Sequence, residues 1–95
     1  MASKKDLKKD IHYLVDEVVG TCLLRQSMDE KLSEEAADKL IMEMLDYRDT
    51  MIDKVNNPPG ENREGKALKS YYRSLRSELL EKVNEAFDKI HEQAE

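Results

Sequence analysis

Residues 40–60 read LIMEMLDYRDTMIDKVNNPPG, and this stretch decides the fold that we expect for the chain. Its apolar residues recur at steps of three and four up to Val55, which is the spacing of one face of an α-helix. The run Asn56-Asn57-Pro58-Pro59-Gly60 then ends the helix, because proline lacks a backbone donor and disfavours the helical conformation in the residue before it. The stretch therefore predicts a long amphipathic helix, over residues 33–55, with a sharp stop.

The segments on both sides of this helix carry the same periodicity. Residues 4–26 predict a first helix and residues 66–92 a third, with the loop 56–65 between the second and the third. Short connections favour antiparallel neighbours, so we expect an all-α, three-helix up-down-up antiparallel bundle as a single domain over residues 1–95. A long-helix hairpin that completes its core by dimerising is the alternative. The residues expected in the core include Leu14, Val18, Leu45 and Leu79.

The second helix has two candidate N-caps. Ser33 is followed in the first turn by Glu34 and Glu35, where the helix dipole favours acidic side chains. Ser27, with Glu30 three residues later, forms a competing capping box that would start the helix earlier. The sequence leaves both starts open.

The composition limits the class of protein. The 95 residues are 39% hydrophobic and 39% charged, with three glycines and two prolines, which is typical of a helix-rich globular protein. The single cysteine, Cys22, excludes an intramolecular disulfide framework and fits a reducing compartment. No stretch approaches the ~20 apolar residues of a membrane span, so we expect a cytoplasmic protein without a membrane partner.

Charge is distributed unevenly along the chain, whose formal net charge is -5. In an up-down-up bundle the start of the first helix and the loop 56–65 lie at one end, which we call the basic end. Its cations are Lys4, Lys5, Lys8, Lys9, Lys54, Arg63, Lys66, Lys69 and Arg73. The opposite, acidic end contains Asp29, Glu30, Glu34, Glu35, Asp38, Glu85, Asp88, Glu92 and Glu95. The basic end suits phosphates, so contact with nucleic acid through this end is a further alternative, although the net negative charge and the lack of a nucleic-acid-binding motif argue against it.

Two arginines interrupt the apolar stripes of the second and third helices. A charge on a core face needs a partner or a ligand, so one hypothesis is a carboxylate- or phosphate-binding pocket made by Arg48, Arg76 and Tyr72. In the alternative, each arginine pairs with an acid while its aliphatic stem packs in the core. We expect Arg48 to be at least half buried and held by an acid on the first or third helix. The candidate acids for the two arginines are Asp10, Asp16, Glu17, Glu43 and Glu78.

The outer side of the first helix suggests a protein contact. Tyr13, Glu17, Gly20 and Leu24 follow one line roughly opposite the core stripe. An exposed surface of this kind suits a partner helix, although scattered exposed apolar residues are also ordinary. The sequence therefore predicts a non-enzymatic interaction module that self-associates or binds a protein partner.

No group of catalytic, cofactor-binding or metal-ligating residues is recognisable in the sequence. His12 with Asp16, and Asp88 with His91, have the helical spacing of ligand pairs, but neither pair has a third ligand. The chain contains no Glu-x-x-His for a carboxylate-bridged metal pair, no nucleophile elbow and no phosphate-binding glycine loop. We therefore expect no metal, no cofactor and no catalytic residue.

Three segments define the layout of most of the chain: IHYLVDEVV at residues 11–19, the Pro58-Pro59-Gly60 loop, and GKALKSYYRSLRSELL at residues 65–80. With this layout the chain resembles a family of small all-helical bacterial proteins that has no established activity. The resemblance implies a bacterial, intracellular, non-enzymatic helical bundle, and it assigns no role to any residue.

Overall fold

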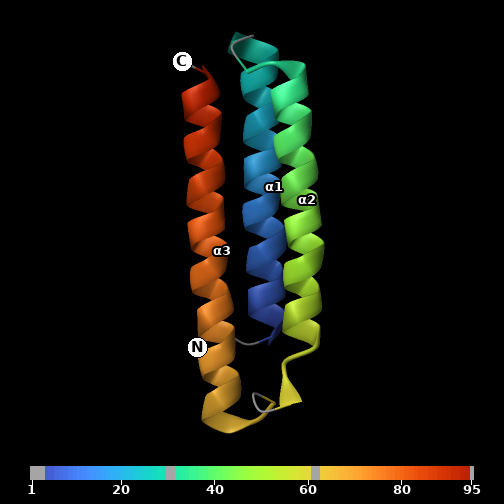
Figure 1. Cartoon of the computed structure of the whole chain (residues 1–95), viewed down its shortest axis with the longest axis vertical. Coiled ribbons are helices and arrows are strands. Elements are labelled where there is room, and N and C mark those ends of the chain that lie inside the picture. Colours follow the sequence, from blue (N-terminus) through green and yellow to red (C-terminus); the bar gives the residue numbers. More distant parts are fainter. Residues whose placement is uncertain (1–3, 30–31, 61–62, 95) are drawn as a thin grey trace.

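Three long antiparallel helices make up the computed structural model, which describes residues 4–29, 32–60 and 63–94 (Figure 1). α1 covers Lys4–Asp29, α2 covers Glu34–Asn56 and α3 covers Gly65–Ala94. The chain runs up α1, down α2 and up α3, and no strand occurs in the described residues. The expected up-down-up bundle is therefore confirmed.

The ends of the helices follow from local capping. The Ser33 hydroxyl accepts a hydrogen bond from the backbone N–H of Ala36 at 3.1 Å and so caps α2. α1 continues to Asp29, so Ser27 lies inside a helix, and of the two starts left open by the sequence the structure has the one at Ser33. At the other end of α2, the backbone N–H of Asn57 donates to the Asp53 carbonyl at 2.9 Å, directly before the two prolines. α3 starts at Gly65, whose φ of 59° lies in the left-handed region that glycine tolerates best.

The core runs along the bundle axis and is built from aliphatic, methionine and tyrosine side chains of all three helices. Val18 and Leu79 are fully buried, as expected, whereas Leu14 and Leu45 are only partly buried and pack against the edge of the core. The fully or almost fully buried side chains of largest volume are Leu7, Ile11, Leu32, Met44, Met51, Leu79 and Ile90. Burial of these side chains supplies the main favourable free energy of folding.

The helices do not pack symmetrically around this core. α1 packs against both other helices, whereas α2 and α3 make the fewest contacts with each other. In Figure 1, α1 lies between and behind the other two helices, so one side of α1 faces away from both. The bundle is 49 Å long and only 18 Å wide, which keeps the basic end far from the acidic end. No described helix combines the length and the apolar character needed to cross a membrane.

Candidate functional site

The side of α1 that faces away from α2 and α3 carries exposed apolar side chains. Tyr13 is 62% exposed and Leu24 is 56% exposed, and both Glu17 and Gly20 between them are exposed as well. Leu23 and Met28 flank this line and are 52% and 72% exposed. We call these six residues the α1 face. Leu23 follows the buried Cys22 but is exposed, because successive helix residues point roughly 100° apart.

Gly20 has no packing role inside the chain. A Cβ atom built at this position meets no other atom within 4 Å, so no neighbouring helix requires a glycine here. A glycine in the interior of a helix costs roughly 1 kcal/mol relative to alanine. Gly20 therefore lowers the stability of α1, and no contact within the bundle explains why a glycine occupies this position.

The two arginines point to different neighbours. The Arg48 side chain is 29% exposed, so it is more than half buried as expected, but its Nη2 contacts Asp49 Oδ1 of its own helix at 3.3 Å. The prediction of an acid on the first or third helix is therefore wrong for Arg48. Arg76 pairs with Asp10 of α1 at 2.9 Å between Nη1 and Oδ2, which is one of the candidate acids. Arg76 itself is exposed, because it lies beside the buried stripe of α3 rather than in it.

Helix geometry explains why the arginines do not meet. The Tyr47 ring lies next to Lys82 of α3, and each helical step rotates by roughly 100°, so Arg48 lies on the other flank of α2. Tyr72 is buried, and its hydroxyl donates to the Val55 carbonyl at 3.4 Å. Arg48, Arg76 and Tyr72 therefore each contact a different partner, and these contacts do not bring the three residues together in one anion pocket. These contacts match the alternative in which each arginine is paired with an acid.

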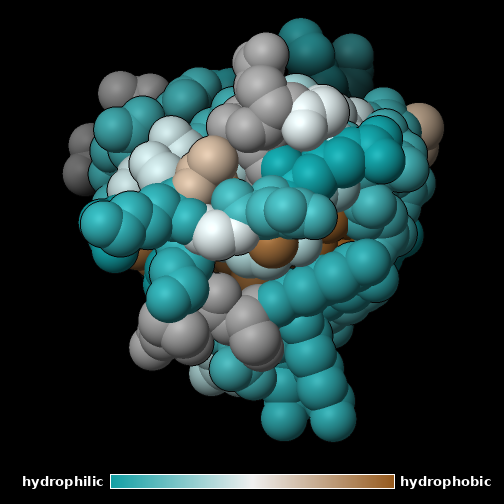
Figure 2. Space-filling model, turned by 90° about the horizontal axis from the view of Figure 1, so that it is seen from below, coloured by the Kyte–Doolittle hydropathy of each residue, from teal (hydrophilic) through white to brown (hydrophobic). Residues whose placement is uncertain are grey.

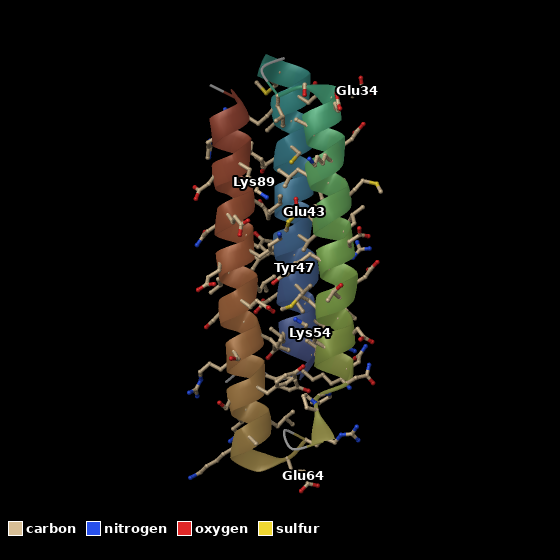
Figure 3. The ribbon with its side chains drawn as sticks, in the orientation of Figure 1. Glu34, Glu43, Tyr47, Lys54, Glu64 and Lys89 are labelled. Atoms are coloured by element: carbon tan, nitrogen blue, oxygen red, sulfur yellow. The ribbon has the colours of Figure 1, made fainter. Side chains whose placement is uncertain are left out.

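The sequence did not predict a cluster of polar side chains between α2 and α3. It consists of Glu43, Lys82, Lys89 and Tyr47, and we call it the polar seam. Glu43 Oε1 accepts a hydrogen bond from Lys82 Nζ at 2.7 Å and lies 3.5 Å from Lys89 Nζ. Figure 3 shows Lys89 extending from α3 toward Glu43 on α2. The hydrogen bond from Lys82 lowers the pKa of the Glu43 carboxyl below its usual value. The signal was present in the sequence, since Lys82 and Lys89 are seven residues apart on one flank of α3.

Tyr47 contributes an unusual group to this seam. Its hydroxyl oxygen is buried and has no hydrogen-bond partner among the described residues. The ring lies 5.6 Å from Lys82 Nζ, measured to the ring centroid, which is within the range of a cation–π contact. Burial raises the pKa of Tyr47 to about 12, with a smaller contribution from the Glu78 carboxylate. The hydroxyl is therefore a neutral group held in a poorly solvated place.

A hollow of about 380 Å³ lies beside the seam, near the start of α2. Its lining residues are Ser33, Glu35, Ala36, Lys39, Leu40, Glu43 and Lys89. Two carboxylates and two ammonium groups balance each other there, so the hollow does not select for ligands of one charge.

A second hollow, of about 290 Å³, lies at the basic end of the bundle. Its lining residues are Lys4, Asn56, Asn57, Pro58, Arg63, Leu68 and Tyr72. Figure 2 views this end along the bundle axis and shows a mostly hydrophilic surface with a small hydrophobic area near its centre. Tyr72 therefore lines a hollow near Lys4 and Arg63 and not one shared by Arg48 and Arg76.

The described residues contain no group of three or more histidine, cysteine, aspartate or glutamate side chains that could hold a metal ion. His12 and His91 are both exposed and lie on different helices. Cys22 is buried, and burial raises the pKa of its thiol, which disfavours the reactive thiolate.

Comparisons with protein-family models, with curated proteins and with solved structures found no match for this chain. Any function must therefore be inferred from the chain's own residues.

Proposed function

We propose that this protein is a helical interaction module that binds a helix of another polypeptide on the α1 face. The observation that carries the proposal is the exposure of Tyr13, Leu24 and Met28, each more than half exposed on a helix side that neither α2 nor α3 covers. A bound helix with an apolar stripe would remove these side chains from water.

The magnitudes are consistent with a specific contact of this size. Full burial of one large apolar side chain contributes roughly 1.5–3 kcal/mol, whereas association costs roughly 4–15 kcal/mol in lost freedom. A single exposed side chain would not meet that cost, but Tyr13, Leu23, Leu24 and Met28 together are of the right order. Gly20 supports the same proposal, because a residue without a side chain lets a second helix approach closely.

The proposal assigns no chemical reaction to the protein and no cofactor. It also includes a cytoplasmic location, supported by the one free and buried thiol of Cys22. The resemblance to a family of small all-helical bacterial proteins implies the same assignment. A phosphate-binding role for Arg48, Arg76 and Tyr72 remains a separate prediction that no contact of these residues favours.

The test is site-specific photocrosslinking in the cell of origin. A photoreactive phenylalanine analogue at position 24 should give one covalent adduct of defined mass, whose attached polypeptide is identified by mass spectrometry. The same analogue at the exposed position Ser77 of α3 is the control and should give none. The additional change Gly20→Arg should abolish the adduct, since a long charged side chain blocks close approach. No adduct at position 24, or equal adducts at both positions, would contradict the proposal.

A further inference from the structure

We infer that the occupant of the α1 face is a second copy of this chain, bound antiparallel about a twofold axis. The inference rests on the proposed function and adds the identity and the direction of the partner helix. It is carried by two independent observations: the symmetric placement of the exposed residues along α1, and the opposite charge of the two ends of the bundle.

Four of the six residues of the α1 face, Tyr13, Glu17, Gly20 and Leu24, are placed symmetrically about one point, and Leu23 and Met28 stand outside this set. Tyr13 and Leu24 are equally far from the midpoint between Val18 and Val19, and so are Glu17 and Gly20. A twofold axis perpendicular to α1 at this midpoint sets Tyr13 of one copy opposite Leu24 of the other, twice. Such an isologous contact uses the same surface on both copies and closes after two chains.

Gly20 acquires a role in this arrangement. Because it lies within two residues of the axis, the two copies of Gly20 come close together where the helices cross. Packed helices lie roughly 8–10 Å apart, and the lower end of that range requires small residues at the contact. The open space around Gly20 is then filled by the second helix.

The charged ends decide between antiparallel and parallel pairing. The side chains at the start of α1 include Lys5 and Lys9, whereas the start of α2 at the opposite end carries Glu34 and Glu35. In the antiparallel register Lys5 lies level with the α1–α2 connection of the second copy, at the end of the bundle that carries these glutamates. A parallel dimer would instead set like charges side by side at both ends.

The length of the bundle strengthens the preference for antiparallel over parallel pairing. The bundle is 49 Å long, several times the Debye length of ~8 Å at physiological ionic strength, so each end interacts mainly with what lies next to it. Of the residues assigned to the acidic end, Glu30 and Glu95 lie outside the described residues, as do the side chains of Asp29 and Glu92. The described acids Glu34, Glu35, Asp38, Glu85 and Asp88 outnumber the cations Arg25, Lys39 and Lys89 at the same end.

The two copies of Glu17 oppose the association, and substitution of this residue tests the proposed arrangement. The two Glu17 carboxylates lie on opposite sides of the axis, about one helix turn apart along α1, where like charges repel. Glu17→Gln should therefore tighten the dimer severalfold, whereas Leu24→Arg should weaken it at least tenfold. Added salt should weaken the parent dimer by screening the attraction between opposite ends. A parallel dimer would respond to salt in the opposite direction.

The closing experiment uses purified full-length chain in two isotopic forms. A benzoyl-phenylalanine at position 13 keeps an aromatic side chain there, and equal amounts of light and heavy protein identify the crosslinks that join two copies. We expect crosslinks between position 13 of one copy and the segment around Leu24 of the other, and none from the same probe at Ser77. Crosslinks between the two segments around position 13 would overturn the antiparallel arrangement.

The failure of this inference can be separated from a failure of the proposed function. If no crosslink joins light and heavy chains at millimolar protein concentration, the second copy is not the occupant. The proposed function would then stand or fall on the adduct formed at position 24 in the cell, which identifies a different polypeptide or none.

Discussion

Tyr13 and Leu24 lie about three turns apart on the same side of α1, and both are more than half exposed. Between them lies Gly20, where an added Cβ atom would meet no other part of the chain within 4 Å. Two large apolar side chains with a glycine between them form a surface into which a second helix can pack. The predictions that follow concern this surface and the polar seam between α2 and α3.

Gly20→Ala should separate the stability of the bundle from its association. The exposed helix interior should become more stable by up to ~1 kcal/mol, because alanine loses less backbone entropy and meets no neighbour. The added methyl group should at the same time weaken association through the α1 face. Urea denaturation at low protein concentration measures the first effect and sedimentation the second. Ser77→Ala, at an exposed site on α3, should leave association unchanged.

Tyr47→Phe should stabilise the protein by about 1 kcal/mol at neutral pH, because it removes a buried hydroxyl that has no partner among the described residues. The folded-state pKa of about 12 is above the ordinary value near 10. The protein should therefore lose stability as the pH rises from about 10 to about 12, where Tyr47 ionises more easily in the unfolded chain. Absorbance titration should show that Tyr47→Phe removes a late-titrating group that the parent and Tyr13→Phe both retain. Its persistence in Tyr47→Phe would assign the late titration to another residue.

Glu43→Gln should cost less than about 1 kcal/mol at neutral pH, because the carboxylate is 37% exposed and partly screened by solvent. The folded-state pKa of Glu43 is lowered, mainly by the hydrogen bond from Lys82, so its contribution is present above the ordinary glutamate pKa. It should be lost as the pH falls through the lowered folded-state value. Denaturation curves of parent and variant should therefore converge in acid, whereas Glu81→Gln, at an exposed site on α3, should show no such convergence. A difference that stays constant with pH would mean that the seam does not stabilise the fold.

Arg48→Met should fold with a stability close to that of the parent. The contact of Arg48 is with Asp49, whose side chain is 72% exposed, so the change leaves no buried acid without a partner. Arg76→Met should lose at most ~1 kcal/mol, because both Arg76 and Asp10 are partly exposed. Added phosphate should affect the melting temperatures of parent and variants equally. A stabilisation by phosphate that both substitutions abolish would favour the two-arginine pocket.

The helices were predictable because their signals are local. The step of three and four through Val55, the Ser33 cap and the two prolines each act within a few residues, and all appear in the structure. Leu32 was not predictable in this way: it lies in a polar connection, yet it is almost fully buried. Its burial depends on how the chain turns between α1 and α2, which no periodicity encodes.

The partners of individual side chains were harder to predict than the helix faces. Leu80 follows the fully buried Leu79 on α3 but is 47% exposed, because the width of a buried stripe depends on how closely the neighbouring helix packs. Periodicity likewise gave Arg48 its partial burial but not its contact with Asp49. The seam around Glu43 joins residues about forty positions apart, and such a pairing depends on the vertical register of α2 and α3. This register is set by the packing of the whole bundle, so the spacing of residues within one helix does not predict it.

Sedimentation equilibrium at low ionic strength tests most directly whether a second copy of the chain covers the α1 face. The parent should change from monomer to dimer as its concentration rises, and Leu24→Arg should remain a monomer over the same range. Leu80→Arg, which places the same charge at an exposed leucine of α3, should dimerise like the parent. A parent that stays monomeric at every concentration, or a Leu24→Arg variant that dimerises as well as Leu80→Arg, would contradict the account.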